Sequence, residues 1–300
     1  MMARAKTREA LVGLVTPGPD GLGGLVRPGD LSLEQLCQAL AALKPPPPHR
    51  ANLVDIEGLE TLGRILVADP RVGARKQGYR LLRLAEFHQA HRRRVAAMFE
   101  AEARLCPSDA LHVAGMDEAG RGPLAGPVVA AAVVLGHGRP LSGLNDSKQV
   151  PEEVREELYE TIVRASLRLG VGVVGPGLIE RVNILQATYV AMRRAVAKLG
   201  TAPDYLLVDG FRVPGLDVPH RGVVGGDALC GSIAAASIVA KVTRDRIMRQ
   251  VARRYPAYGF ERNKGYGTAE HWEALRRHGP CPAHRPSFIR RGEETGVVDG

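Results

Sequence analysis

Aromatic side chains, paired cysteines and long apolar runs are all scarce in this chain of 300 residues. Phe, Trp and Tyr together make up 4% of it, which argues against a binding surface built mainly on the stacking of bases. The four cysteines, Cys37, Cys106, Cys230 and Cys281, lie far apart and form no CxxC pair. A disulfide framework and a zinc site are therefore not expected, and the reducing cytoplasm is the expected location.

Segments that direct a chain to a membrane are also missing from the sequence. No apolar run reaches the length that spans a bilayer without interruption. Residues 1–6, MMARAK, lack the apolar stretch of a signal peptide. We therefore expect no membrane partner.

Positive charge is the first feature present in excess. The 41 Lys and Arg residues against 32 Asp and Glu give a formal charge of +9 and an isoelectric point near 9.7. This balance favours an anionic partner, and nucleic acid is the first candidate. A chain of this length, with an ordinary hydrophobic share of 45%, forms one large domain or one domain with an appendage. We find no internal repeat and expect a monomer.

Residues 1–110 form a predicted N-terminal extension. Its beginning is rich in Gly and Pro and is expected to be partly disordered. A capping box predicts a short helix at 32–43, and a run of prolines after it predicts a stiff linker. Two more helices are predicted at 56–67 and 74–104, so the later part of the extension is helical and basic.

The predicted helix at 74–104 lies in the most basic part of the chain. Residues 71–104 hold nine Lys or Arg and three Glu, a net charge of +6. One interpretation is an arm that follows the phosphates of a nucleic acid. The other is a solvated basic helix that packs on the main domain through Leu84, Val95 and Phe99. Both interpretations remain open from the sequence.

Residues 111–290 alternate between apolar strands and helical stretches, which predicts a mixed α/β sheet flanked by helices. The apolar run at 128–135 is expected to be buried on both faces. The residues after 278 are expected to be irregular, with 291–300 as a tail. Strands are predicted at 113–116, 128–135, 169–174, 205–209 and 219–224, and helices at 151–164, 178–199, 227–254 and 269–278.

Four acidic residues lie where apolar runs meet Gly-containing turns. Asp117 and Glu118 end one run, Asp209 ends another, and Asp227 follows a third. An unpaired carboxylate near a core is costly, so several at such positions suggest that a bound cation offsets their charge. Oxygen ligands suit Mg²⁺ or Mn²⁺. The alternative for each residue taken alone is a surface turn, or a helix N-cap in the case of Asp227.

Three further features are candidates for contacts with nucleic acid. Gly120 and Gly122 flank Arg121, so the backbone there can approach a ligand closely and donate its N–H groups. Lys148 precedes a predicted helix, where it binds a phosphate or is merely solvated. Tyr266 lies in a glycine-rich loop, where it offers a stacking face or packs at a hinge.

These segments together resemble bacterial ribonuclease HII. The GMDEAGRG and SIAAASIVAKVTRD blocks are highly specific, and Arg121 favours type II over the related type III enzymes, which usually lack it. The resemblance covers about residues 111–290 and rests on GMDEAGRGPLAGPVVAAAVVL (115–135), NDSK (145–148), VDG (208–210), GD with SIAAASIVAKVTRD (226–227 and 232–245), and YPAYGFERNKGYGT with HGPCPAHRPSF (255–268 and 278–288).

The resemblance implies a fold, an activity and a set of roles. The expected fold is an RNase H-like mixed sheet with helices on both faces. The expected activity is endonucleolytic hydrolysis of RNA in RNA–DNA hybrids and at single ribonucleotides in duplex DNA. The four carboxylates would bind two divalent ions. The backbone of the Gly-Arg-Gly motif would read the 2′-OH that separates RNA from DNA, and Tyr266 would sense the junction.

Two other functions were weighed against this one. A protein that binds hybrids without cleaving them would have lost at least one of the four carboxylates, and all four are present. Another RNase H-like nuclease, such as a DNA resolvase, would not need the Gly-Arg-Gly motif with Tyr266, which serve ribose sensing. The chain also departs from the family, because Gly225 stands where relatives often carry Lys. Residues 69–83 faintly resemble the N-terminal extension of enzymes from Gram-positive bacteria.

Overall fold

The computed structural model describes residues 56–136, 141, 143, 144 and 150–294. The helix predicted at 32–43, the proline linker and Lys148 lie outside these residues, so they stay predictions. The chain divides into two compact units, one of Met1–Ala97 with Pro140–Gly143 and one of Met98–Arg139 with Leu144–Gly300.

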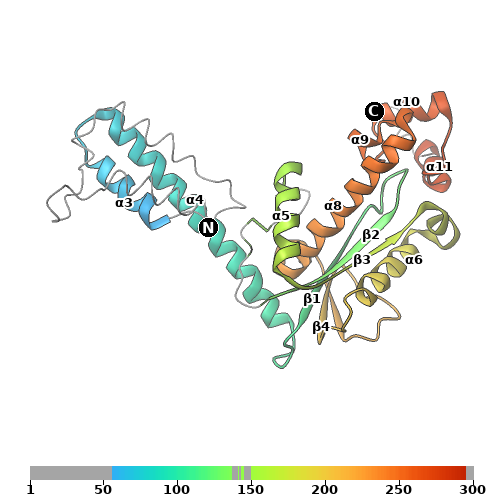
Figure 1. Cartoon of the computed structure of the whole chain (residues 1–300), viewed down its shortest axis with the longest axis horizontal. Helices are drawn as coiled ribbons and strands as arrows, with labels where there is room; N and C mark the ends of the chain where they lie inside the picture. Colours follow the sequence, from blue (N-terminus) through green and yellow to red (C-terminus); the bar gives the residue numbers. More distant parts are fainter. Residues whose placement is uncertain (1–55, 137–140, 142, 145–149, 295–300) are drawn as a thin grey trace. The chain divides into compact units, whose positions relative to one another are not determined.

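The described part of the first unit consists mainly of two helices, the second of which continues into the second unit from Met98. They are α3 (Ile56–Val67) and α4 (Val72–Leu105), and they confirm the helices predicted at 56–67 and 74–104 (Figure 1). Asp69 lies in the turn between them. Its carboxylate accepts the N–H of Arg71 at 2.9 Å and pairs with the guanidinium of Arg71 at 2.8 Å. The hydrogen bonds from Arg71 lower the pKa of Asp69 to about 2.

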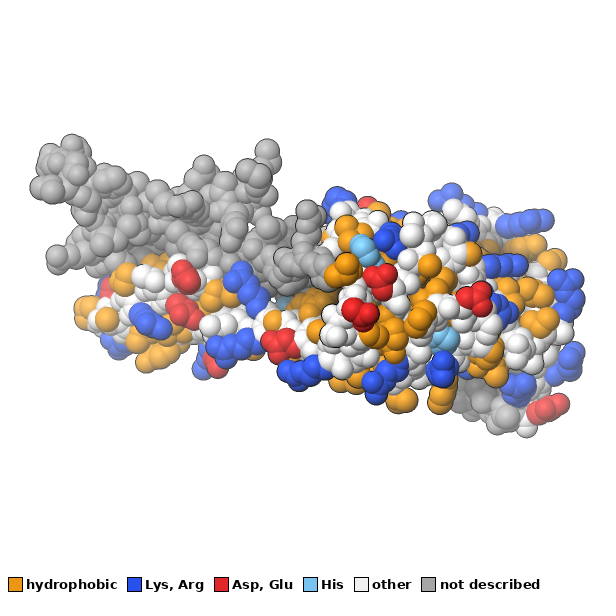
Figure 2. Space-filling model, turned by 90° about the horizontal axis from the view of Figure 1, so that it is seen from below, with side chains coloured by type: hydrophobic (Ala, Val, Ile, Leu, Met, Phe, Trp, Pro, Cys, Tyr) orange, Lys and Arg blue, Asp and Glu red, His pale blue; other side chains and the backbone are white. Residues whose placement is uncertain are grey.

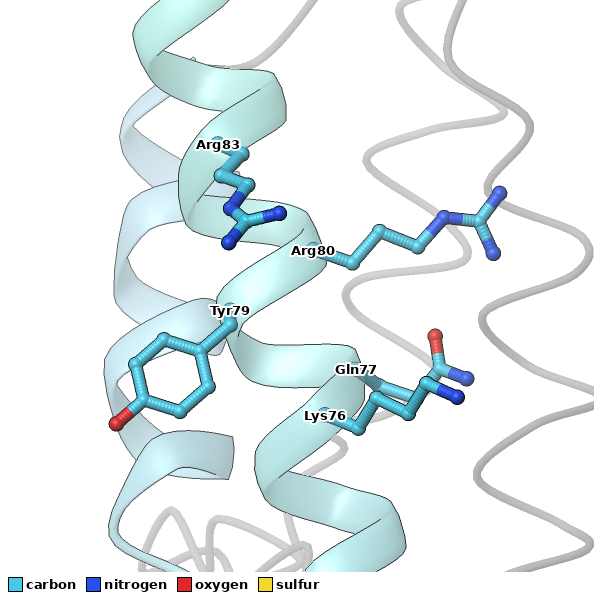
Figure 3. A pocket seen from close by; sticks show the side chains of 5 residues that line it. All are labelled: Lys76, Gln77, Tyr79, Arg80 and Arg83. Atoms are coloured by element: carbon cyan, nitrogen blue, oxygen red, sulfur yellow. The ribbon is translucent and has the colours of Figure 1, made fainter.

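The N-terminal part of α4 has one buried and one exposed side. Ala74, Leu81 and Ala85 are buried at helical spacing. The backbones of α3 and α4 lie close together at Gly78. A Cβ on this residue would be only 2.7 Å from the backbone N of Val67. The opposite side carries cations and borders a hollow lined by Lys76, Gln77, Tyr79, Arg80 and Arg83 (Figure 3).

The second unit is built on one mixed five-stranded sheet, in the order β3-β2-β1-β4-β5. The pairs β1–β2 and β2–β3 are antiparallel, whereas β1–β4 and β4–β5 are parallel. All five strands confirm predicted ones, and β2 is buried almost throughout. The strands are β1 (Val113–Ala119), β2 (Val128–Leu135), β3 (Ser166–Val174), β4 (Tyr205–Asp209) and β5 (His220–Val223).

Helices cover both faces of this sheet (Figure 1). Ala114 and Met116 of β1 belong to the core shared with α6 (Pro176–Ala197). Because side chains alternate along a strand, Gly115 faces the other way, toward α8 (Gly231–Arg254). A Cβ on Gly115 would lie 2.0 Å from the backbone of Ser232, so only glycine permits α8 to approach β1 this closely. The expected mixed sheet with helices on both faces is confirmed.

The structure differs from the sequence-based predictions in three places. The single helix predicted at 227–254 is two helices, because Cys230 is extended (φ −123°, ψ 129°). α6 contains one non-helical residue, Asn183 (φ 66°). The segment expected to be irregular contains α11 (Pro286–Glu294), whose Phe288 packs on the cores. The remaining helices are α5 (Glu152–Ala165), α7 (Gly226–Leu229), η3 (Pro256–Tyr258), α9 (Phe260–Asn263) and α10 (Ala269–His278).

The cysteines and the helices of the described residues bear on two expectations from the sequence. The cysteines there, Cys106, Cys230 and Cys281, are free thiols. None of the helices in this part of the chain combines the length and the apolar character needed to cross a bilayer.

Candidate active site

Asp117, near the end of β1, and Asp209, the last residue of β4, lie on two neighbouring strands of the sheet. The parallel register pairs Met116 of β1 with Val208 of β4, so these two carboxylates belong to the next residues along each strand. Asp117 follows the same alternation as Gly115 and lies on the α8 side, where it bonds the side chain of Ser237. It is only 6% exposed. The sheet thus brings together two acids that are far apart in the sequence.

The carboxylates of this region act on one another electrostatically. Burial raises the pKa of Asp117 well above its usual range, and the charges of Glu118 and Asp209 raise it further. Burial also raises the pKa of Glu118, although the Arg121 guanidinium works in the opposite direction. Buried acids that repel one another in this way are stabilised by a positive charge placed among them.

Asp227 lies near Asp209, because the residue before Asp227 donates a backbone hydrogen bond to the Asp209 carboxylate. The N–H of Gly226 donates to Oδ1 of Asp209 at 2.7 Å, and Asp227 follows directly in the first turn of α7. Gly225, in the left-handed region at φ 65°, is the N-cap residue of this short helix. The alternative that Asp227 serves as an N-cap is therefore wrong.

The four acids fit a site for divalent cations by their chemistry. They offer hard oxygen ligands, and two of them have raised pKa values. Within the described residues, however, no group of three or more His, Cys, Asp or Glu side chains is arranged to hold a metal ion as it stands. The role of Asp117, Glu118, Asp209 and Asp227 as metal ligands therefore stays a prediction.

Residues 120–122, the Gly-Arg-Gly loop, follow β1 directly. Gly120 has φ 91°, and a Cβ there would lie 2.1 Å from Nε of Arg244. The position therefore requires glycine. The half-exposed side chain of Arg121 pairs with Glu118 at 3.2 Å, so the structure directs it to a candidate ligand. A Cβ on Gly122 would meet nothing within 4 Å.

Two buried arginines, which the sequence did not single out, lie beneath this loop. Arg244 of α8 donates to the carbonyls of Pro127 at 3.0 Å and Ala125 at 3.1 Å. Arg285 donates to the carbonyls of the Gly-Arg-Gly loop itself. Arginine is usually exposed, so no local pattern marks these two positions. The SIAAASIVAKVTRD and HGPCPAHRPSF blocks, which contain them, were the only signal.

Tyr266 lies in the loop before α10 and is 43% exposed. Arg244 and Lys241 of α8 lie beneath its ring, 5.5 Å and 5.7 Å from the centroid. The same Arg244 touches the space beside Gly120, so it connects the tyrosine to the Gly-Arg-Gly loop. The structure thus brings these two candidate nucleic-acid contacts together around one guanidinium.

A pair of buried histidines holds the backbone of Tyr266. The N–H of Cys281 donates to Nδ1 of His284 at 2.9 Å, so Nε2 of His284 carries the proton and donates to Nε2 of His271 at 3.0 Å. Nδ1 of His271 then donates to the carbonyl of Tyr266 at 2.8 Å. Burial lowers the pKa of both histidines, that of His284 to about 4, which keeps the chain of donors neutral.

The surface of the described residues is mixed in character on the face that Figure 2 shows, where Lys and Arg side chains are scattered among apolar and acidic ones. A hollow beside Asp209 is lined by residues of β4, β5 and the turns after them, including Gly210, Arg212 and Arg221. Phe211, 78% exposed, also lines it, which gives this surface an aromatic face and two cations next to a candidate ligand.

A mixed five-stranded sheet flanked by helices on both faces is consistent with the fold of RNase H-like nucleases. The family model described as Ribonuclease HII matches residues 114–291. A Ribonuclease HII from Desulfitobacterium hafniense (strain DSM 10664 / DCB-2) is 44% identical over 248 residues, which cover 83% of this chain and 95% of the relative. One from Clostridioides difficile (strain 630) is 53% identical over 180 residues, 60% of this chain and 71% of the relative. The chain belongs to the ribonuclease HII family.

Solved structures agree with the fold. The ribonuclease H2 of Pyrococcus horikoshii OT3 superposes with a TM-score of 0.50 at 27% identity, covering 63% of this chain and all of that one. The RNase HII of Archaeoglobus fulgidus, solved as a complex with PCNA, gives a TM-score of 0.50 at 26% identity, with 58% and 94% covered. The RNase H-like fold and the type 2 ribonuclease H class expected from the sequence are thereby confirmed.

Proposed function

We propose that this chain is an endonuclease that hydrolyses the RNA strand of RNA–DNA hybrids and incises duplex DNA at single ribonucleotides. The observation that carries the proposal is the position of Asp117 and Asp209 on adjacent parallel strands, where burial and the neighbouring carboxylates raise the pKa of Asp117. Family membership supports ribonuclease H activity as such. The choice of substrate and the use of two ions, Mn²⁺ or Mg²⁺, are the finer parts of the proposal.

The side chains that would hold the cations are Asp117, Glu118, Asp209 and Asp227. When bound, two divalent ions supply an activated water and stabilise the leaving oxygen of a phosphodiester. The chain itself orients its acids. Ser237 bonds Asp117 and the N–H of Gly226 fixes Oδ1 of Asp209 at 2.7 Å, so these carboxylates do not need to reorganise when the substrate arrives.

Selection of the ribose falls to the Gly-Arg-Gly loop. The N–H groups of Arg121 and Gly122 have no hydrogen-bond partner among the described residues. A 2′-OH offers such donors an acceptor, and a deoxyribose does not. The open space at Gly122 permits the sugar to approach the backbone closely.

Tyr266 supplies an aromatic face for the sugar next to the scissile phosphate. Its ring is supported from below by Arg244 and is partly exposed above.

Lys148 adds a phosphate contact. The enzyme acts as a monomer in the cytoplasm, in DNA replication and repair.

The direct test is cleavage of a duplex DNA that carries one ribonucleotide, with Mg²⁺ and Mn²⁺ compared. An all-DNA duplex of the same sequence and a long RNA–DNA hybrid serve as reference substrates. We expect incision only where a ribonucleotide is present, and complete loss with EDTA. Incision of the all-DNA duplex, or no incision of either ribonucleotide substrate with either metal, would refute the proposal.

A further inference from the structure

Arg285 is a fully buried cation that forms no salt bridge within the described residues, although the charge of Glu180 acts on it electrostatically. It is 0% exposed, and no salt bridge joins it to a carboxylate in the part of the chain that the structure describes. Burial, followed by the charge of Arg244, lowers the pKa of Arg285 to about 9, so it remains charged at neutral pH. A buried charge is costly unless its donors are satisfied. The guanidinium of Arg285 therefore needs hydrogen-bond acceptors inside the protein.

Its donors bind backbone carbonyls of the turn that follows β1. Nη2 donates to the carbonyls of Gly120 and Gly126, both at 2.7 Å, and Nη1 donates to that of Arg121 at 3.0 Å. Nε donates to Gly126 at 2.9 Å. The ring of Phe288 covers the guanidinium with its centroid 5.1 Å away. These contacts span more than 150 residues of sequence and converge on the Gly-Arg-Gly loop.

The carbonyl contacts of Arg285 also fix the direction of the neighbouring backbone N–H groups. In a trans peptide the C=O of one residue and the N–H of the next point in opposite directions. Because the carbonyls of Gly120 and Arg121 point toward Arg285, the N–H groups of Arg121 and Gly122 point away from it. These are the two amides without a partner among the described residues. The positive charge on the carbonyl side also polarises both peptides toward stronger donation.

We propose that Arg285 is a positioning residue for ribose selection. It holds the Gly-Arg-Gly loop with its carbonyls inward, and thereby presents the N–H groups of Arg121 and Gly122 to the 2′-OH of the substrate. The inference rests on the proposed function and adds the residue that fixes the direction of the two donors. Arg244 binds only Ala125 and Pro127 in the same turn, so it does not orient these peptides.

A purely structural role is the competing explanation. In that case Arg285 would only fasten α11 to the turn, and its loss would lower stability without a preference among substrates. The two explanations therefore differ in the ratio of two affinities, which loss of stability alone does not change.

The test uses the Asp209→Asn protein as a binding-competent, inactive parent. Affinity is measured for a duplex with one ribonucleotide and for an all-DNA duplex of the same sequence. Arg285→Lys keeps the charge but cannot make the fork of contacts, and Arg285→Met removes the charge. We expect the affinity ratio to fall by about tenfold in Arg285→Met and by less in Arg285→Lys. Leu158→Ala, a buried change on α5, is the stability control and should leave the ratio unchanged.

Each outcome has a distinct meaning. A parent that shows no preference for the ribonucleotide duplex refutes the proposed function. A parent with a preference that both Arg285 variants retain refutes the inference. If neither variant folds, amide hydrogen exchange on the parent decides. The N–H groups of Arg121 and Gly122 should be protected by the ribonucleotide duplex and not by the DNA duplex, and equal exchange with both would overturn the inference.

A row of exposed cations on α4 supports a second inference, which rests on separate observations. Lys76, Arg80 and Arg83 recur at spacings of four and three, which places them along one side of the helix. All three are exposed, and none has a carboxylate partner among the described residues. Figure 3 shows Lys76 and Arg80 directed away from Tyr79. By contrast, Arg71 and Arg75 bind Asp69 and the backbone of the preceding turn.

We infer that this row of cations binds the phosphate backbone of duplex nucleic acid without regard to sequence. The spacing and the exposed state of the three side chains match an anionic surface, and the described residues offer these charges no carboxylate partner. Of the two interpretations left open by the sequence, packing through Phe99 is supported by its ring, which would lie 2.5 Å from a Cβ on Gly231 of α8. The exposed row of cations farther toward the N-terminus of α4 supports phosphate binding. One helix accommodates both. This inference too rests on the proposed function for its substrate.

The test measures the salt dependence of hybrid affinity in the full-length protein. Replacing Lys76, Arg80 and Arg83 by Gln should reduce the slope of log affinity against log salt by roughly 0.9 for each lost phosphate contact. Turnover at saturating substrate should be retained. A control with Arg164, Arg181 and Lys198 replaced by Gln removes the same charge from other exposed positions. An unchanged slope in the α4 variant, or an equal change in the control, would overturn the inference. Absence of hybrid binding by the wild type would refute the proposed function instead.

Discussion

The guanidinium of Arg244 lies 5.5 Å from the centre of the Tyr266 ring and is completely buried. A cation beneath an aromatic face is attracted by the electrons of the ring. Because Arg244 is itself fixed by the carbonyls of Ala125 and Pro127, it fixes the ring in turn. One face of Tyr266 is thus held by the protein, and the exposed part of the side chain is available to a substrate.

Replacement of Tyr266 by Ala should therefore depress cleavage at an RNA–DNA junction more than cleavage within continuous RNA. We expect a difference of about tenfold, because loss of stacking on a sugar or base costs ~1–3 kcal/mol. Tyr266→Phe keeps the ring and should retain most of the junction cleavage. The measurement is kcat/KM on the two substrates. An equal loss on both would indicate a general structural role.

Asp209→Asn should abolish turnover and leave hybrid binding largely intact. The substitution removes a charged ligand, but its Oδ1 can still accept the N–H of Gly226 that now lies 2.7 Å away. We expect a loss in kcat on the order of a thousandfold, which corresponds to ~4 kcal/mol of barrier. Asp204→Asn, at an exposed acid that binds the backbone of Leu111 and His112, is the matched control. Cleavage near the wild-type rate by the Asp209 variant would remove this residue from the site.

The two glycines of the Gly-Arg-Gly loop should respond differently to Ala. Gly120→Ala would place Cβ against Arg244 in a left-handed backbone, so it should lower Tm as well as activity. Gly122→Ala meets nothing in the protein and should leave Tm unchanged while it reduces cleavage at a single ribonucleotide. Gly177→Ala, another open position, is the control. Normal cleavage by the Gly122 variant would contradict close approach of the ribose.

Lowering the pH should reduce the stability of the folded protein, because the buried pair His271 and His284 is neutral in the folded state. The pKa of His284 is about 4 in the folded chain, against about 6.5 in an unfolded one. Between these values the unfolded chain binds more protons, so stability should fall as the pH is lowered from about 6.5 toward 4, by on the order of 1–3 kcal/mol. Urea unfolding at pH 7.5 and pH 5 measures this change. His284→Gln should flatten the dependence, and His278→Gln at the surface should not.

Much of the fold could be predicted because its signals are local. The helix at 56–67 and the strand at 128–135 match the structure to the residue. The acids Asp117 and Asp209 were found because a charge at the end of an apolar run is costly and therefore unusual. What the sequence could not show is that these two residues lie on adjacent strands, since the parallel pairing of β1 with β4 is a non-local event.

The parts that escaped prediction depend on contacts across the fold. Arg285 and His284 belong to a short segment whose charges and prolines are typical of an irregular tail. Only the folded chain shows that Arg285 binds Gly120 and that His284 supports Tyr266 through His271. The interruption at Cys230 was missed for a similar reason, because both halves of the segment have ordinary helix-forming sequences.

The contact between Arg285 and Gly120 joins residues that leave the ribosome at very different times. Chains emerge from their N-terminal side, at roughly 5–20 residues each second. The strand that carries Asp117 and the loop that follows it are therefore exposed well before the guanidinium that orients them has been made. A chain that has not yet reached Arg285 holds Asp117 and Glu118 without the contact that fixes the Gly-Arg-Gly loop. The loop should therefore become fixed only after Arg285 has been added to the chain, long after the strand that carries Asp117 has been made.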